Sequence, residues 1–111
     1  MATPGALEGI IGTYLDIEGV RAAALVSTDG MLVASAGTVE ADMQSLAALA
    51  SAALSSAAGL GEELLSGAKP RLMAVDLREL ALVLAPVSSE LLLLLVGGPA
   101  VMALASNGGV A

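Results

Sequence analysis

The longest helical pattern in the chain, residues 38–66, constrains the fold more than any other segment. Between Met43 and Gly61 this pattern contains no charged residue, yet serines interrupt it too often for a membrane span. An ordinary surface helix has one apolar stripe and a charged opposite face. Here the opposite face carries mostly alanine, serine and glycine. We therefore expect this second face to be covered by another structure or molecule.

A helical wheel divides the segment into two sides. The apolar face, which is expected to pack on a sheet, consists of Met43, Leu46, Ala47, Ala50, Ala53, Leu54, Ala57, Leu64 and Leu65. The opposite side consists of Ser45, Ala48, Ala52, Ser55, Ser56, Gly59 and Glu63. Leu49 and Leu60 lie at one border of the apolar face, too far round for the sheet to cover them fully. Thr38 is the expected N-cap, with Glu40 and Asp42 in the first turn.

Two β-rich segments upstream of this helix predict a hairpin. They cover residues 20–27 and 31–36, and Asp29-Gly30 lies between them. Asp-Gly is a strong hairpin signal because the tight turn needs positive φ at its central residues. The first segment is largely apolar on both faces, so it is predicted to be an interior strand.

Three more strands are predicted after the long helix, at residues 71–76, 80–87 and 91–96. Their connectors are too short for a crossover helix, so neighbouring strands should pair antiparallel. The run of five leucines and a valine at 91–96 should be central, and 71–76, which is charged at both ends, should be an edge. Short helices are expected at residues 4–16 and 99–106. One layered domain, with helices on both faces of a five-stranded sheet, then accounts for residues 1–111.

Composition and charge exclude several classes of function. Apolar residues make up 57% of the 111 residues and charged residues 14%, against about 45–50% and about 25% in typical domains. A chain this apolar is not disordered, and it is expected to bury surface against a copy or a partner. The net charge of −7 argues against nucleic acid binding and against an anionic membrane surface.

The residue inventory argues against catalysis. The chain has neither cysteine nor histidine, which excludes disulfides, zinc–thiolate sites and nucleophile–histidine catalysis. The glycines at 59 and 61 lie late in a helix and not at a strand-to-helix turn, so they do not form a phosphate loop. We expect no enzyme activity, no cofactor and no metal. Without a signal peptide pattern at its start, the chain is expected to be cytoplasmic.

A membrane span is the alternative for residues 91–111, which carry no charge. Gly97-Gly98-Pro99 interrupts this stretch, and no basic residue flanks it. Its strongly apolar part, residues 91–96, has the length of a strand. No membrane insertion is therefore expected.

The order of elements and two local motifs resemble the Roadblock (dynein light chain) family. The motifs are LDIEGV at residues 15–20, which contains Gly19, and ALVSTDGMLVAS at residues 24–35, which contains the Asp29-Gly30 turn. The resemblance extends over residues 7–106. One departure is the turn after the third strand, where glycine is expected and Leu77-Arg78-Glu79 stands.

The resemblance implies a fold and a set of interfaces. The implied fold is a profilin-like α+β sandwich of order αββαβββα, with the long second helix on one face of a mostly antiparallel sheet and the two terminal helices on the other. It also implies a homodimer formed by the third strand and the second helix. The implied dimer residues are Leu49, Ala53, Leu60, Arg71, Leu72, Met73, Ala74 and Val75. The paired helices would form a platform for a partner, made of Ser45, Ala48, Leu49, Ala52, Ser55, Ser56 and Gly59.

Members of this family bind Ras-like small GTPases, and bacterial members similar to MglB stimulate hydrolysis by a partner GTPase. The resemblance therefore implies a non-catalytic regulator of a Ras-like, MglA-like GTPase. The alternative is a structural adaptor that dimerises, as dynein light chains do, without sensing a nucleotide state. The long helix contains no arginine between residues 38 and 66, so an arginine finger supplied from this platform is not expected.

Overall fold

The computed structural model describes residues 4–107, and this range shows the expected order of elements. Helix α1 (Pro4–Gly12) continues into the 3₁₀ helix η1 (Thr13–Asp16). The first hairpin and the long helix follow as β1 (Val20–Ser27), β2 (Leu32–Gly37) and α2 (Met43–Leu64). The second half contains β3 (Met73–Asp76), β4 (Ala81–Pro86), β5 (Leu91–Gly97), η2 (Pro99–Val101) and α3 (Met102–Asn107). The 91–111 stretch thus begins as a strand, and its last four residues lie outside the described range.

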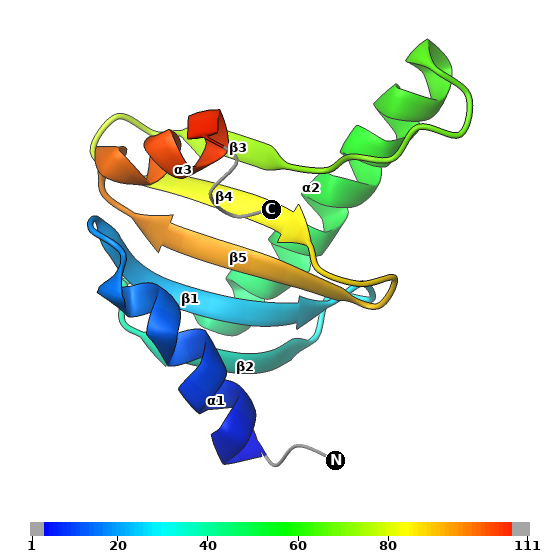
Figure 1. Ribbon diagram of the computed structural model, residues 1–111. Coiled ribbons are helices and arrows are strands. Elements are labelled where there is room, and N and C mark those ends of the chain that lie inside the picture. Colours follow the sequence, from blue (N-terminus) through cyan, green and yellow to red (C-terminus); the bar gives the residue numbers. More distant parts are fainter. Residues whose placement is uncertain (1–3, 108–111) are drawn as a thin grey trace.

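Within the described residues, the five strands form one antiparallel sheet in the order β2-β1-β5-β4-β3. Helix α2 covers one face of the sheet, and α1 and α3 lie on the other (Figure 1). The α+β fold predicted from the sequence is confirmed, with β5 at the centre, β1 in the interior and β3 at an edge. The sequence reading did not identify β2 as the second edge.

The sheet buries a separate apolar cluster on each face, which explains the uninterrupted leucine run of β5. Leu93 and Leu95 pack toward α1 and α3, whereas Leu92 and Leu94 pack toward α2. Successive side chains of a strand point to opposite faces of the sheet. A strand that is buried on both faces therefore has a continuous run of apolar residues in its sequence. Helix α2 contributes three buried residues, Ala47, Ala50 and Leu54.

The β1–β2 turn differs in one respect from the expected Asp-Gly turn. Gly30 has φ +92°, its N–H donates to the Ser27 carbonyl at 2.9 Å, and Ser27 N–H donates to the Met31 carbonyl at 2.8 Å. The expectation of positive φ at Asp29 is wrong. The loop spans residues 28–31, and such loops need only one left-handed residue, after a type I turn. The Asp29 carboxylate instead accepts a hydrogen bond from the Ser27 hydroxyl.

Gly19 lies where the start of β1 meets the end of β5. Its φ is +91°, and a Cβ at this position would stand 2.9 Å from the Cβ of Ala100. The Gly19 carbonyl accepts a hydrogen bond from Gly98 N–H at 3.0 Å. A side chain at residue 19 would therefore be strained at this positive φ, and it would also clash with Ala100 in the segment that follows β5.

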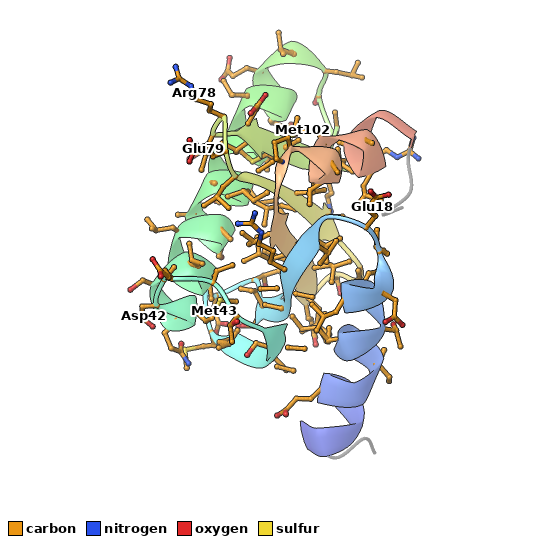
Figure 2. The ribbon with its side chains drawn as sticks, turned by 90° about the vertical axis from the view of Figure 1, so that its left-hand side faces the viewer. Glu18, Asp42, Met43, Arg78, Glu79 and Met102 are labelled. Atoms are coloured by element: carbon orange, nitrogen blue, oxygen red, sulfur yellow. The ribbon has the colours of Figure 1, made fainter. Side chains whose placement is uncertain are left out.

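Helix α2 begins later than predicted, at Met43 and not near Thr38. Its N-cap is Asp42, whose carboxylate accepts from the backbone N–H of Gln44 at 3.1 Å and from the Ser45 hydroxyl at 3.0 Å. Asp42 and Met43 mark this end of the helix in Figure 2. Thr38 is not the cap, because its backbone N–H donates to the carbonyl of Arg21 on β1. That hydrogen bond holds residue 38 beside the sheet, so the helix starts only beyond it.

In the β3–β4 turn, Arg78 adopts the positive φ for which a glycine was expected. Arg78 has φ +78° and is the only non-glycine residue with positive φ in the described range. Its backbone N–H donates to the Asp76 carboxylate at 2.9 Å, and Leu77 N–H donates to the Leu80 carbonyl at 2.8 Å. Figure 2 shows the Arg78 side chain projecting into solvent on the side of the molecule that carries α2. The arginine therefore occupies a left-handed conformation that usually favours glycine.

Candidate interaction surface

The outer side of α2 is an exposed surface without charge over most of its length. All seven residues predicted for the partner platform are exposed: Ser45, Ala48, Leu49, Ala52, Ser55, Ser56 and Gly59. Charged side chains appear on α2 only at Glu62 and Glu63. Most of these platform side chains are small, so another backbone can approach the helix closely.

An apolar stripe of four leucines and one alanine runs along the border of this outer side. It consists of Leu46, Leu49, Ala53, Leu60 and Leu64, which share one side of the helix at 100° per residue. Leu49 is 66% exposed, Leu60 67% and Leu64 86%. These values are high for large apolar side chains. The stripe therefore offers apolar area for contact with another molecule.

Two leucines predicted to pack on the sheet do not do so. Leu64 and Leu65 are 86% and 70% exposed, so their assignment to the sheet-packing face is wrong. The wheel gave the direction of these side chains but not the extent of the sheet below them. The C-terminal turns of α2 extend past β3 (Figure 1), and no α2 residue after Leu54 is buried in the described structure.

Strand β3 forms one edge of the sheet and carries three of the predicted dimer residues, Met73, Ala74 and Val75; it starts two residues later than predicted, so Arg71 and Leu72 precede it. Within the described residues it pairs only with β4. Leu72, Met73, Ala74 and Val75 are half-buried and Arg71 is exposed. An unpaired edge presents backbone N–H and C=O groups to any incoming strand. β3 therefore has the geometry needed to pair with a strand of another chain.

A groove of about 690 Å³ lies between the N-terminal end of α2 and the β3–β4 turn. Its apolar lining includes Leu46, Leu77, Leu80, Leu82 and Val96, and its polar lining includes Arg21, Glu40 and Glu79. The groove is assembled from segments far apart in the chain, and sequence reasoning missed it. The sequence signal that could have indicated the groove was the pair Leu77 and Leu80, two large apolar residues in the β3–β4 turn.

A second hollow, of about 390 Å³, lies on the other side of α2. Its lining includes Ser51, Ser55 and Lys69. The Ser51 hydroxyl donates to the Thr28 carbonyl at 2.6 Å, which ties the helix to the β1–β2 turn. Of the residues predicted for the partner platform, Ser55 lies at this hollow.

The interior of the described structure is apolar. Among the described residues, no buried side chain is polar or charged, and no group of three or more acidic residues is placed to hold a metal ion. General acid–base catalysis and metal catalysis both require such groups brought together in a protected pocket. The features that stand out are instead exposed apolar side chains, an open sheet edge and a groove, which are features of protein contact.

By length and composition, α2 also meets the requirements for a membrane span. It has 22 residues, a mean hydropathy of 1.3 in its most apolar window, and 11% of that window buried. One such helix is weak support for a span, because a helix that covers a sheet passes the same test. Ala47, Ala50 and Leu54 pack on the sheet in this way.

The fold and surface define a class of protein: a small αββαβββα domain that presents a long helix and an open sheet edge for protein contact. The sequence matches the family model described as Roadblock/LC7 domain over residues 7–97. The chain therefore belongs to the Roadblock/LC7 domain family. Comparison of the sequence with curated proteins gives no significant match.

Solved structures of this family share the fold. A Roadblock/LC7 domain from Streptomyces avermitilis superposes with a TM-score of 0.76 at 23% identity, covering 82% of this chain and 77% of that one. MglB from Myxococcus xanthus gives 0.75 at 20% identity, covering 84% and 70%. An MglB structure described as having a tetrameric arrangement gives 0.73 at 19%, covering 88% and 75%. At these identities the similarity concerns the fold.

Proposed function

We propose that this protein is a non-catalytic homodimer in the cytoplasm that binds and regulates a Ras-like small GTPase of the MglA type. The observation that carries the proposal is the exposed, largely charge-free outer side of α2 next to the open edge of β3. Membership of the Roadblock/LC7 family supports it, and so does the fold shared with MglB proteins. The β3 edge of each protomer would contact the second copy, and the outer side of α2 would contact the GTPase.

The homodimer places β3 beside the β3 of a second copy and α2 beside its α2. An isologous contact of this kind joins two five-stranded sheets at their edges and pairs the two helices on the same face. Leu49, Ala53 and Leu60 then lie between the helices. Ala48, Ala52 and Gly59 remain on the outer surface for the GTPase.

Any effect on GTP hydrolysis would arise from positioning groups of the GTPase itself. Helix α2 contains neither arginine nor lysine between Met43 and Leu64, so the platform has no cation to insert beside the transferred phosphate. An arginine finger is the usual way in which a partner supplies charge to that transition state. We therefore expect at most a modest stimulation of hydrolysis.

The test is binding to a small GTPase from the same organism, loaded with GDP or with a GTP analogue, followed by calorimetry and a hydrolysis assay. Binding that depends on the nucleotide supports the proposal. Ala52→Glu, which places charge on the exposed platform, should abolish this binding, whereas Ile10→Glu on α1 should not. Equal binding to both nucleotide states would favour the structural adaptor. Absence of binding, together with an unchanged hydrolysis rate, would refute the GTPase proposal.

A further inference from the structure

The hollow of about 390 Å³ on one side of α2 is bounded by three segments that meet at one end of the sheet. The β1–β2 turn, the β4–β5 turn and the segment between α2 and β3 all lie at this end, because β1 and β4 end there and β3 begins there (Figure 1). Thr28 N–H donates to the Glu90 carbonyl at 3.0 Å, and the Ser51 hydroxyl donates to the Thr28 carbonyl at 2.6 Å. These hydrogen bonds hold the two turns and α2 together, so the hollow is pre-formed.

The charge of this hollow is opposite to that of the whole chain. The chain has 11 acidic and 4 basic residues, yet Lys69 is the only charged residue among the described residues that line the hollow. Within the described part of the chain, the Lys69 ammonium group has no hydrogen-bond or ion-pair partner. Glu62, at the end of α2, instead accepts from the Ser66 hydroxyl at 3.3 Å and from Gly67 N–H at 3.0 Å. The hollow therefore offers a positive charge that is free to attract an anion.

Hydroxyl groups lie on the same walls as this cation. The five that line the hollow are those of Thr28, Ser51, Ser55, Ser88 and Ser89. The Ser88 oxygen accepts from the backbone N–H groups of Glu90 and Leu91, at 3.2 and 3.1 Å. A hydroxyl has two acceptor lone pairs and one donor proton, so what Ser88 retains is its proton. It therefore suits a ligand that accepts, such as the oxygen of a carboxylate or a phosphate.

The deeper part of the hollow is apolar. Leu54 and Leu92 are 9% and 2% exposed, and Ala58, Pro70 and Pro86 complete the apolar lining. An inorganic anion would leave these apolar groups in contact with water, whereas a molecule with an anionic group and a short apolar chain would cover them. The volume lies within the range of small-molecule pockets, about 300–1,000 Å³.

We propose that this hollow binds a small organic anion, a carboxylate or a phosphate monoester with a short apolar chain. Lys69 and the Ser88 hydroxyl contact the anionic group, and Leu54 and Leu92 contact the chain. Of the lining residues, only Ser55 also belongs to the predicted partner platform, and none belongs to the predicted dimer residues. The proposal therefore goes beyond the proposed function and depends neither on the homodimer nor on the GTPase.

The first experiment titrates the full chain with hexanoate and with hexyl phosphate and follows the amide chemical shifts by NMR. The amides of Glu90 and Leu91, which donate to Ser88, should shift with a dissociation constant in the millimolar range. The anion that binds more tightly identifies the preferred anionic group. Hexan-1-ol lacks the charge and inorganic phosphate lacks the chain, so each should bind at least roughly threefold more weakly.

The second experiment repeats the titration of the tighter anion with variants. Lys69→Gln should raise the dissociation constant roughly threefold to fivefold, because the exposed cation that pairs with the anion is removed. Arg78→Gln is the matched control, since it removes the same charge from an exposed side chain outside the hollow, and it should leave the constant unchanged. Ala58→Leu keeps a good helix former but fills the hollow, so it should abolish binding.

Four results would overturn the proposal. One is the absence of binding by both organic anions at concentrations of tens of millimolar. Another is binding of hexan-1-ol or inorganic phosphate as tight as that of the organic anions, because charge and chain would then not act together. Equal effects of Lys69→Gln and Arg78→Gln would show that only the net charge matters. Shifts centred on the exposed Leu49 and Leu60, and not on the hollow, would show unspecific adsorption to α2.

Discussion

Replacing Arg78 with glycine should stabilise the protein, although glycine usually weakens a fold. Arg78 has φ +78°, and the left-handed conformation costs a residue with a Cβ about 1–2 kcal/mol. Glycine avoids that cost but loses about 0.5–1 kcal/mol through the larger freedom of the unfolded chain. The net expectation for Arg78→Gly is a gain of about 0.5–1 kcal/mol in the free energy of unfolding. The Arg78 side chain is exposed, so little packing is lost.

Glu79→Gly is the matched control for this prediction. Glu79 is the next residue of the same turn and is also exposed, but its φ is not positive. It should therefore show only the cost of glycine, a loss of about 0.5–1 kcal/mol. Urea denaturation followed by circular dichroism measures both variants, at one fixed protein concentration because self-association would add to the apparent stability. If both variants shift stability in the same direction, the strain at Arg78 does not exist as described.

Three further predictions follow from other parts of the structure. If the proposed homodimer forms through β3, Ala74→Asp at this edge should convert it to a folded monomer in light scattering, whereas Val33→Asp on the opposite edge strand should leave the dimer mass unchanged. Gly19→Ala should lower the free energy of unfolding by about 1–3 kcal/mol, because of the positive φ and the 2.9 Å approach to Ala100; thermal denaturation with an unchanged midpoint would contradict this. Because each protomer carries a net charge of −7, added salt should screen the repulsion between the two protomers of the proposed homodimer and lower its dissociation constant. A constant that rises with salt would indicate that ion pairs dominate the interface.

The fold could be predicted from the sequence because its determinants are local. The leucine run of β5 indicated a strand buried on both faces, the short connectors required antiparallel pairing, and Asp29-Gly30 placed the hairpin. Each of these signals depends on a few neighbouring residues and elementary geometry. These signals placed β5 at the centre, β1 in the interior and β3 at an edge, whereas the full strand order was not predicted and the assignment of the helices to the two faces came from the family resemblance.

The remaining details depend on contacts between distant segments. Thr38 and Asp42 are both good capping residues, and only the hydrogen bond from Thr38 to β1 determines which one starts the helix. A helical wheel gives the direction of Leu64 but not the length of the sheet beneath it. The groove combines residues from β1, α2 and the β3–β4 turn, so no single stretch of sequence reveals it.

The unsupported end of α2 has a consequence for how this protein varies among its relatives. Within one molecule, Leu64 has little contact to restrict its replacement. If a second copy of the chain covers it, replacements at residue 64 must be compatible with the surface of that copy, which the same gene encodes. Residue 64 should then covary with the positions that it contacts there, through a contact that no single chain contains. Gene duplication would relax this constraint, because two diverged copies can each retain only one side of the contact.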